Sequence, residues 1–243
     1  MLIKKDKEYG YINIFIDIEG SGWSMKDHAM VQIGAVVTES TGSMDPSYLD
    51  VFQVLINIPP ERAWDSKCVT EFWNSSPELK AQKIKIDNKE GLEPTVAMQH
   101  FVNFMQTTFQ KYANSDINRI RIITDTVSYD TAWINMYLAY YANAKPLHLI
   151  FDDHFKDLLE LGSYQQGRSG ITHVEELKII KRDENLKRKH GKVGKEGRGQ
   201  FSIEEACYKK LKIKKRPITK ADHDAVHDAA NIAETYYITM YHK

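Results

Sequence analysis

An apolar run that ends in two acidic residues sets the strongest constraint on the fold of this chain. Residues 11–18, YINIFIDI, are rich in isoleucine and aromatic side chains, a pattern that predicts a buried strand. Asp17 and Glu19 stand one residue apart at its end, and residues i and i+2 of a strand project from the same face. Gly20 and Gly22 follow directly. We therefore expect a strand that delivers two carboxylates to one place.

Strand and helix patterns then succeed each other along the chain. Two strands are predicted over Met30–Glu39 and 49–58, and the turn-forming residues between them favour an antiparallel meander. This order predicts an α/β protein with a mixed sheet flanked by helices, in which the first three strands are antiparallel. Further strands are predicted at 119–124 and 147–151, and helices at 66–76, 93–112, 130–144, 155–161, 172–181, 202–211 and 221–241.

Length and composition favour one domain, 1–243, in the cell interior. The chain has 243 residues, 42% of them hydrophobic, which is enough for a sizeable core. No apolar run approaches the roughly 20 residues of a membrane-spanning helix, and the N-terminus does not resemble a secretory signal. We expect a soluble cytoplasmic protein with no membrane partner. Cys68 and Cys207 lack metal-ligand spacing, so we expect both to be reduced and structural.

The net charge of zero hides an uneven distribution. Residues 181–220 hold 15 Lys/Arg and 5 Asp/Glu, a local balance of +10, which leaves 18 basic and 28 acidic residues, or −10, elsewhere. Four glycines and no apolar periodicity within this stretch predict a basic mobile segment around 181–200. Such a segment is either a solvated loop or an arm that binds phosphates, and we favour the arm because an acidic body would otherwise repel a polyanion.

The paired acids of the first strand suit a divalent cation. Two like charges a few ångströms apart repel each other unless a cation lies between them. Carboxylate oxygens are ligands for Mg²⁺ or Mn²⁺, and Gly20 and Gly22 leave room for a substrate to approach. A solvated strand end with two acids is the alternative for Asp17 and Glu19 when they are considered alone.

Acidic residues recur where a second site element is expected. Asp130 or its rival Asp125 follows the strand predicted at 119–124, at the same edge of the sheet as the first two acids. Taken in isolation, Asp130 is more simply explained as the N-cap of the next helix.

A third acidic stretch, DHDAVHDAA, opens the last predicted helix. His223 and Asp228 have the spacing of a loop histidine and an acid one turn into a helix that begins near Asp224. Competing pairs are His223 with His227 and Asp224 with Asp228, which share helical faces and suit a Zn²⁺ site or an ordinary polar face.

In combination, the three stretches resemble the DEDDh exonucleases, the DnaQ-like group of the ribonuclease-H-like superfamily. The motif is D-x-E on a first strand, an Asp after a middle strand, and H-x4-D at the last helix. The resemblance extends over nearly the whole chain. The residues that carry it are Asp17, Glu19, Asp130, His223 and Asp228.

A further stretch, VTEFWNSSPELKA, is similar to an aromatic-rich helix segment of phage 3′-5′ exonucleases and of a related bacterial exoribonuclease group. Two departures stand out: Ile18 occupies a position that is threonine in many relatives, and Phe72 beside Trp73 occupies the place of a usual Trp-Trp pair. Neither departure removes a candidate ligand. Both leave the substrate preference open.

The resemblance implies hydrolysis of a phosphodiester bond at the free 3′ end of a nucleic acid by two divalent metals, Mg²⁺ or Mn²⁺. It implies that Asp17 bridges the two ions, that Glu19 and Asp228 bind the first, that Asp130 is an outer ligand acting through water, and that His223 is the general base. RNA and DNA remain equal candidates as the substrate. The residues expected to contact the terminal nucleotide are Glu19, Gly20, Trp23 and Trp73.

Two alternatives keep other functions open. The chain could be a nucleic-acid-binding module without catalysis, which would use the basic segment and show a steep salt dependence. The doubled His-Asp at His223-Asp224 and His227-Asp228 also resembles the phosphohydrolases of the HD type, which would require a helical bundle. The oligomeric state is not predicted by either pattern.

Overall fold

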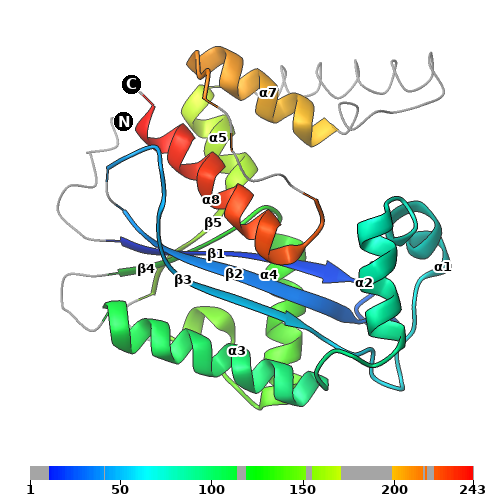
Figure 1. Ribbon diagram of the computed structural model, residues 1–243. Coiled ribbons are helices and arrows are strands. Elements are labelled where there is room, and N and C mark those ends of the chain that lie inside the picture. Colours follow the sequence, from blue (N-terminus) through cyan, green and yellow to red (C-terminus); the bar gives the residue numbers. More distant parts are fainter. Residues whose placement is uncertain are drawn as a thin grey trace, which may run out of the picture.

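A five-stranded mixed sheet forms the centre of the protein (Figure 1). The computed structural model describes residues 11–40, 42–113, 119–151, 155–170, 199–215, 217 and 222–242. The strand order within this part is β3-β2-β1-β4-β5. The first three strands pair antiparallel and the last two run parallel to β1, as predicted. The strands are β1 (Tyr11–Gly20), β2 (Met30–Glu39), β3 (Ser47–Leu55), β4 (Arg119–Thr124) and β5 (Phe155–Glu160).

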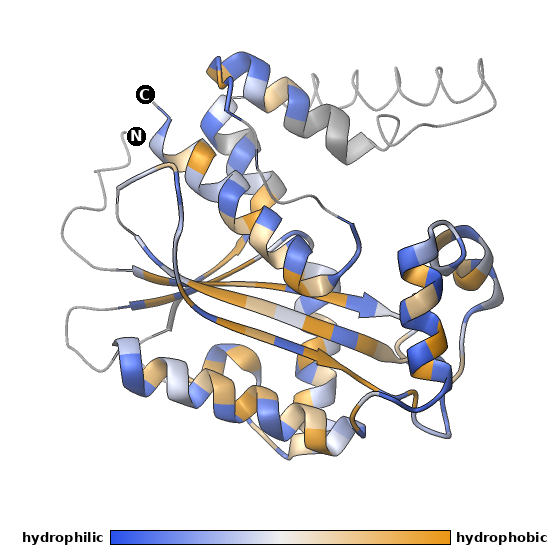
Figure 2. Ribbon diagram, viewed as in Figure 1, coloured by the Kyte–Doolittle hydropathy of each residue, from blue (hydrophilic) through white to orange (hydrophobic). Residues whose placement is uncertain are grey.

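Helices cover both faces of the sheet and one of its ends (Figure 1). One face packs against α3 (Pro94–Thr108) and α4 (Val127–Tyr137), and the other against α8 (Ala225–Tyr241). Apolar residues are concentrated on the strands, and apolar and polar residues alternate along the helices (Figure 2). The remaining α-helices of the described part are α1 (Ser66–Cys68) and α2 (Pro77–Asp87), beyond the end of β1, and α5 (Leu161–Ser169) and α7 (Gly199–Leu211), near α8.

The alternation of β1 decides which side chains reach which layer. Ile14, Ile16 and Ile18 are buried in the core beneath α3 and α4. Phe15 is buried in the other core, against α8. Because side chains alternate along a strand, the odd-numbered Asp17 and Glu19 lie on the α8 face with Phe15. The predicted shared face of the two acids is therefore confirmed.

A close approach of α8 to β2 brings the C-terminal helix to those acids. Gly34 is the register partner of Asp17 in the β1–β2 ladder. A Cβ atom added to Gly34 would lie 2.2 Å from the backbone carbon of Ala225 and from the backbone nitrogen of Val226, in the first turn of α8. Only glycine admits the helix at this distance. The first turn of α8 is thereby placed directly over the acidic end of β1.

Two predictions near the middle of the chain were wrong. The apolar run 147–151, predicted as a strand, contains the 3₁₀ turn Leu147–Leu149, and the strand next to β4 is β5, within a stretch predicted as helix. Short apolar runs do not separate strand from buried helix by periodicity, and pairing with β4 overrides the local preference of FKDLLE. The helix predicted over 172–181 and the basic segment up to residue 198 lie outside the described residues.

Cys68 and Cys207 are free cysteines, with Cys68 half-buried and Cys207 buried. No described helix combines the length and the apolar character that a bilayer crossing requires.

Substituting Gly34 by alanine tests the helix–strand approach. We expect Gly34→Ala to lower the free energy of unfolding by about 1–3 kcal/mol, because the added methyl group has no space against the α8 backbone. Urea denaturation followed by circular dichroism measures the change. Gly42→Ala is the control, since nothing lies within 4 Å of a Cβ there and only its φ of +75° is strained. A smaller loss for Gly34→Ala than for Gly42→Ala would contradict the proposed close contact.

Candidate active site

Asp17 and Glu19 form the floor of the candidate site. The β1–β2 register shifts between Glu19 and Gly20, so the regular ladder ends where the acids are placed. Glu19 is only 8% exposed, and the Oδ2 atom of Asp17 is buried without a hydrogen-bond partner. A buried, unpartnered carboxylate oxygen is costly, and a bound cation would satisfy it.

Asp130 enters the site from α4. It lies one turn into the helix, where its Oδ2 accepts a hydrogen bond from the backbone N–H of Thr126 at 3.1 Å. Thr126 holds the N-cap position, so the prediction that Asp130 caps the helix was wrong. The helix begins earlier than expected because the carboxylate reaches back to the free N–H of the first turn, as the acid of a capping box does. Asp130 is 3% exposed.

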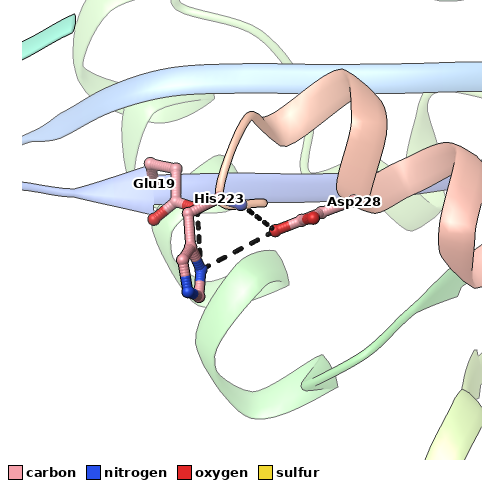
Figure 3. A group of neighbouring side chains, drawn as sticks. All are labelled: Glu19, His223 and Asp228. Atoms are coloured by element: carbon pink, nitrogen blue, oxygen red, sulfur yellow. Dashed lines mark hydrogen bonds and ion pairs between the residues drawn. The ribbon is translucent and has the colours of Figure 1, made fainter. Parts of the chain in front are cut away.

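The turn before α8 brings His223 and Asp228 together (Figure 3). The Oδ1 of Asp228 accepts from the backbone N–H of Asp222 at 2.9 Å, and its Oδ2 accepts from the backbone N–H of His223 at 3.1 Å. The Nδ1 of His223 lies 3.9 Å from Oε1 of Glu19 and 3.9 Å from Oδ2 of Asp228. One ligand atom from each of the three residues falls within 4.8 Å of the others. Residues about two hundred positions apart thus share one site.

The competing pairs in this stretch have other partners. Asp224 is the N-cap of α8, and its side chain accepts a hydrogen bond from the backbone N–H of Val226. His227 points to solvent and its Nδ1 lies 3.2 Å from a carboxylate oxygen of Asp222. The His223–His227 and Asp224–Asp228 alternatives are therefore disfavoured. A helical bundle of the HD type is excluded by the five-stranded sheet.

Burial and the charges of neighbouring acids raise the pKa of all four acids. Burial is the largest cause in each case. For Asp17, the charges of Glu19, Asp130 and Asp228 add to it, in that order. The pKa of Asp130 and the pKa of Asp228 each rise to about 7, although hydrogen bonds from backbone N–H groups oppose the rise. Four such groups can be ionised together only with compensating positive charge, so the donor set fits Mg²⁺ or Mn²⁺.

The expected nucleotide contacts are placed very differently from one another. Trp23 is 79% exposed in the loop after β1. Trp73 is fully buried, packs against the rings of Trp64 and Phe72, and donates from Nε1 to the carbonyl oxygen of Gly20 at 3.1 Å. The prediction of Trp73 as a stacking face was therefore wrong, because its ring has no accessible face for a base. Its contact instead fixes the end of β1.

A side chain at Gly20 would displace the ring of Tyr129. A Cβ atom there would lie 2.5 Å from the phenolic oxygen of Tyr129 and 3.1 Å from the carbonyl oxygen of Gly22. Tyr129 precedes Asp130 on α4, and burial followed by the charge of Glu19 raises its pKa. No local sequence pattern marks Tyr129, because the approach of its ring to Gly20 is a tertiary contact.

The described part of the chain is an α/β fold with a buried acidic site at the end of β1. No protein-family model matches the sequence, and a sequence search finds no match among curated proteins. Solved structures do match. E. coli exonuclease I in complex with a dT13 oligonucleotide superposes with a TM-score of 0.54 at 12% identity, over 92% of this chain and 40% of that one. The zinc-bound complex of the same E. coli protein with single-stranded DNA superposes with a TM-score of 0.54 at 12% identity, over 96% of this chain and 40% of that one.

A second protein of known structure has a similar fold. A full-length 3′-exonuclease matches with a TM-score of 0.50 at 14% identity, over 96% of this chain and 60% of the other. The chain thus spans about two fifths of exonuclease I and three fifths of this second protein. At these identities the likeness establishes the fold, and it confirms the predicted fold class.

A pH-dependent response to metal tests the electrostatics of the site. Because the folded pKa values lie above those of free carboxyl groups, the folded protein binds more protons, and these groups lower the stability of the metal-free protein as pH rises from about 4 through about 7. We expect Mn²⁺ to raise the melting temperature more at about pH 8 than at about pH 5, and metal at 100 times its Kd adds about 2.7 kcal/mol.

Two variants control this measurement. Asp17→Asn should stabilise the metal-free protein at the higher pH and lose the response to Mn²⁺, since it removes one of the repelling charges and one ligand. Glu90→Gln, at an exposed acid between α2 and α3, should keep the full response. An equal response at both pH values, or a full response in Asp17→Asn, would show that Mn²⁺ binds elsewhere.

Proposed function

We propose that the protein is a metal-dependent 3′-5′ exonuclease that hydrolyses phosphodiester bonds at the 3′ end of single-stranded or frayed nucleic acid and releases nucleoside 5′-monophosphates. The observation that carries the proposal is the convergence of four acids and one imidazole at the end of β1 in a nuclease fold. E. coli exonuclease I, which shares the fold, was crystallised with single-stranded DNA oligonucleotides. Single-stranded DNA is accordingly the first substrate to test, with RNA beside it.

The donors suit a pair of hard cations. Asp17, Glu19, Asp130 and Asp228 would hold the ions, with Asp17 central because the other three charges all act on it. Bound there, two divalent ions would supply positive charge to the attacking and leaving oxygens of an in-line displacement. The unpartnered Oδ2 of Asp17 is the oxygen most in need of such a ligand.

His223 is the group we assign to proton transfer. A neutral imidazole accepts a proton near neutral pH, and this ring is partly exposed, so water can reach it. Its Nδ1 faces the carboxylates of Glu19 and Asp228, each at 3.9 Å. A proton held at Nδ1 would be stabilised by both charges. The same carboxylates would orient the ring.

Trp23 is the remaining candidate for contact with a base. It follows Gly20 and Gly22 in the loop that leaves the acidic end of β1, and its ring is largely exposed. Aromatic rings bind single-stranded nucleic acid by stacking on bases, with little dependence on sequence. The substrate's terminal nucleotide would lie between this ring and the acids.

The activity itself is tested on matched 3′-labelled RNA and DNA strands, with and without a complementary strand. We expect Mn²⁺ or Mg²⁺ to support release of labelled mononucleotide, and EDTA and Asp17→Asn to abolish it. His223→Ala should lower kcat by about 10²–10⁴-fold while keeping the metal-dependent thermal shift, because the base is not a ligand. Its matched control is His227→Ala, which removes an exposed histidine from the first turn of α8 and should keep most of the activity.

Three outcomes would overturn these roles. Intact strands in the presence of metal, together with salt-sensitive binding, would replace the enzyme by a nucleic-acid-binding module. Internal cuts without mononucleotide release would exclude an exonuclease. Loss of metal binding in His223→Ala would make the histidine a ligand.

The stacking role of Trp23 has its own test. Trp23→Ala should raise KM for a single-stranded oligonucleotide by about 5- to 160-fold with a small change in kcat, since a base–aromatic stack contributes about 1–3 kcal/mol. Steady-state kinetics with short oligonucleotides separate the two constants. Tyr140→Ala, at an aromatic residue 76% exposed just after α4, should leave both unchanged. An unchanged KM in Trp23→Ala would remove this residue from the binding site.

A further inference from the structure

The turn that carries His223 has an uncommon backbone conformation. The φ of His223 is +63°, in the left-handed region that side chains other than glycine adopt infrequently. Backbone N–H groups on this turn donate to both oxygens of Asp228, which ties the turn to the first turn of α8. Such a conformation persists where the surroundings fix it, and residues held in this way cluster at functional sites.

Two glutamines clamp the next residue, Asp224. Gln53, on β3, donates from Nε2 to Oδ1 of Asp224 at 2.8 Å. Gln82, on α2, donates from Nε2 to Oδ2 at 3.2 Å. The same carboxylate caps α8 through the N–H of Val226. One side chain therefore joins α2, β3 and α8 immediately after His223.

Phe72 holds the imidazole ring itself. The ring centroids of Phe72 and His223 are 4.7 Å apart, with an interplanar angle of 68°, an edge-to-face contact. Phe72 belongs to the π-helical turn Val69–Trp73, between α1 and α2.

Phe72 is linked to β1 through its neighbour Trp73. Trp73, its neighbour, is fully buried, and the two rings are 5.3 Å apart at 86°. Trp73 also donates a hydrogen bond to the carbonyl oxygen of Gly20, next to Glu19. A continuous set of contacts thus runs from Gly20 through Trp73 and Phe72 to His223. These contacts therefore fix the position of the imidazole relative to β1, the strand that carries Asp17 and Glu19.

We propose that Phe72 is a positioning residue for His223, and that the segment Val69–Trp73 forms a platform which sets the imidazole relative to the acids of β1. Gln82 supports the same placement from α2 by holding Asp224. This inference rests on the proposed function. It adds a role for a segment that contributes no acid to the site.

The test compares variants at position 72 by steady-state kinetics on the preferred oligonucleotide. Phe72→Leu keeps an apolar side chain and removes the ring, and it should lower kcat by about 10- to 100-fold, the size expected for misplacing a catalytic group by about 1 Å. KM and the Mn²⁺-dependent thermal shift should stay unchanged. Phe72→Tyr restores the ring and should restore kcat. Phe104→Leu, which removes a partly buried ring from α3, should leave kcat unchanged.

A double-mutant cycle decides whether Phe72 acts through the histidine. In a His223→Ala background, Phe72→Leu should cause no further loss, because the group that it positions is already gone. An equal loss in both backgrounds, or a changed KM, would overturn the positioning role in favour of general folding or substrate contact. An unchanged kcat in Phe72→Leu would overturn it directly.

A spectroscopic readout keeps the inference separate from the activity. The imidazole proton resonances of His223, assigned by their loss in His223→Ala, should shift in Phe72→Leu because the ring current of the neighbouring phenyl group is removed. Active wild-type protein with unmoved resonances would refute the inference and leave the proposed function standing. Inactive wild-type protein would refute the proposed function, and the resonances would then decide whether the platform still holds the ring.

Discussion

The first turn of α8 lies against Gly34 of β2, and the rest of the site depends on that contact. Gly34 is the partner of Asp17 across the β1–β2 ladder, so a helix that touches one strand there is placed over the other. Asp228 and His223 belong to that first turn and the residues just before it. A side chain at position 34 would move the C-terminal part of the site away from the N-terminal part. Because Gly34 has no side chain, α8 can pack close enough to β2 for regions about two hundred residues apart in the sequence to form one site.

This contact has an electrostatic consequence. Packing α8 over the end of β1 brings Asp228 to Asp17 and Glu19, and α4 adds Asp130; burial is the largest cause that raises the pKa of each of these four carboxyl groups. The backbone N–H groups that donate to Asp130 and Asp228 relieve only part of the repulsion, and Oδ2 of Asp17 has no hydrogen-bond partner. Folding therefore prepares a place where positive charge is strongly favoured. The platform at Val69–Trp73 and the clamp on Asp224 then set an imidazole beside that place without adding another acid.

The sequence predicted the features that follow from local patterns. The i, i+2 relation placed Asp17 and Glu19 on one face. Spacing alone left several His-Asp pairs open before the last helix, and the resemblance to the DEDDh exonucleases selected His223 with Asp228. Prediction from the sequence failed where tertiary contacts determine the structure. The run 147–151 looked like a strand because short apolar stretches have no distinctive period. Trp73 looked available for stacking because burial is not visible in a motif. The contacts of Phe72, Gln53 and Gln82 join residues more than 140 positions apart, and no local signal marks them.

Above all, we propose that the acids of β1, α4 and α8 form a single divalent-metal site. The most direct measurement is the anomalous scattering of Mn²⁺ in crystals of the protein with a bound oligonucleotide. We predict manganese peaks in contact with the carboxylate of Asp17, with oxygen atoms of Glu19, Asp130 and Asp228 around them, at the roughly 2.0–2.6 Å distances of hard-cation ligands. Saturating Mn²⁺ with no peak among these four residues, or with the acids turned away from one another, would contradict the claim.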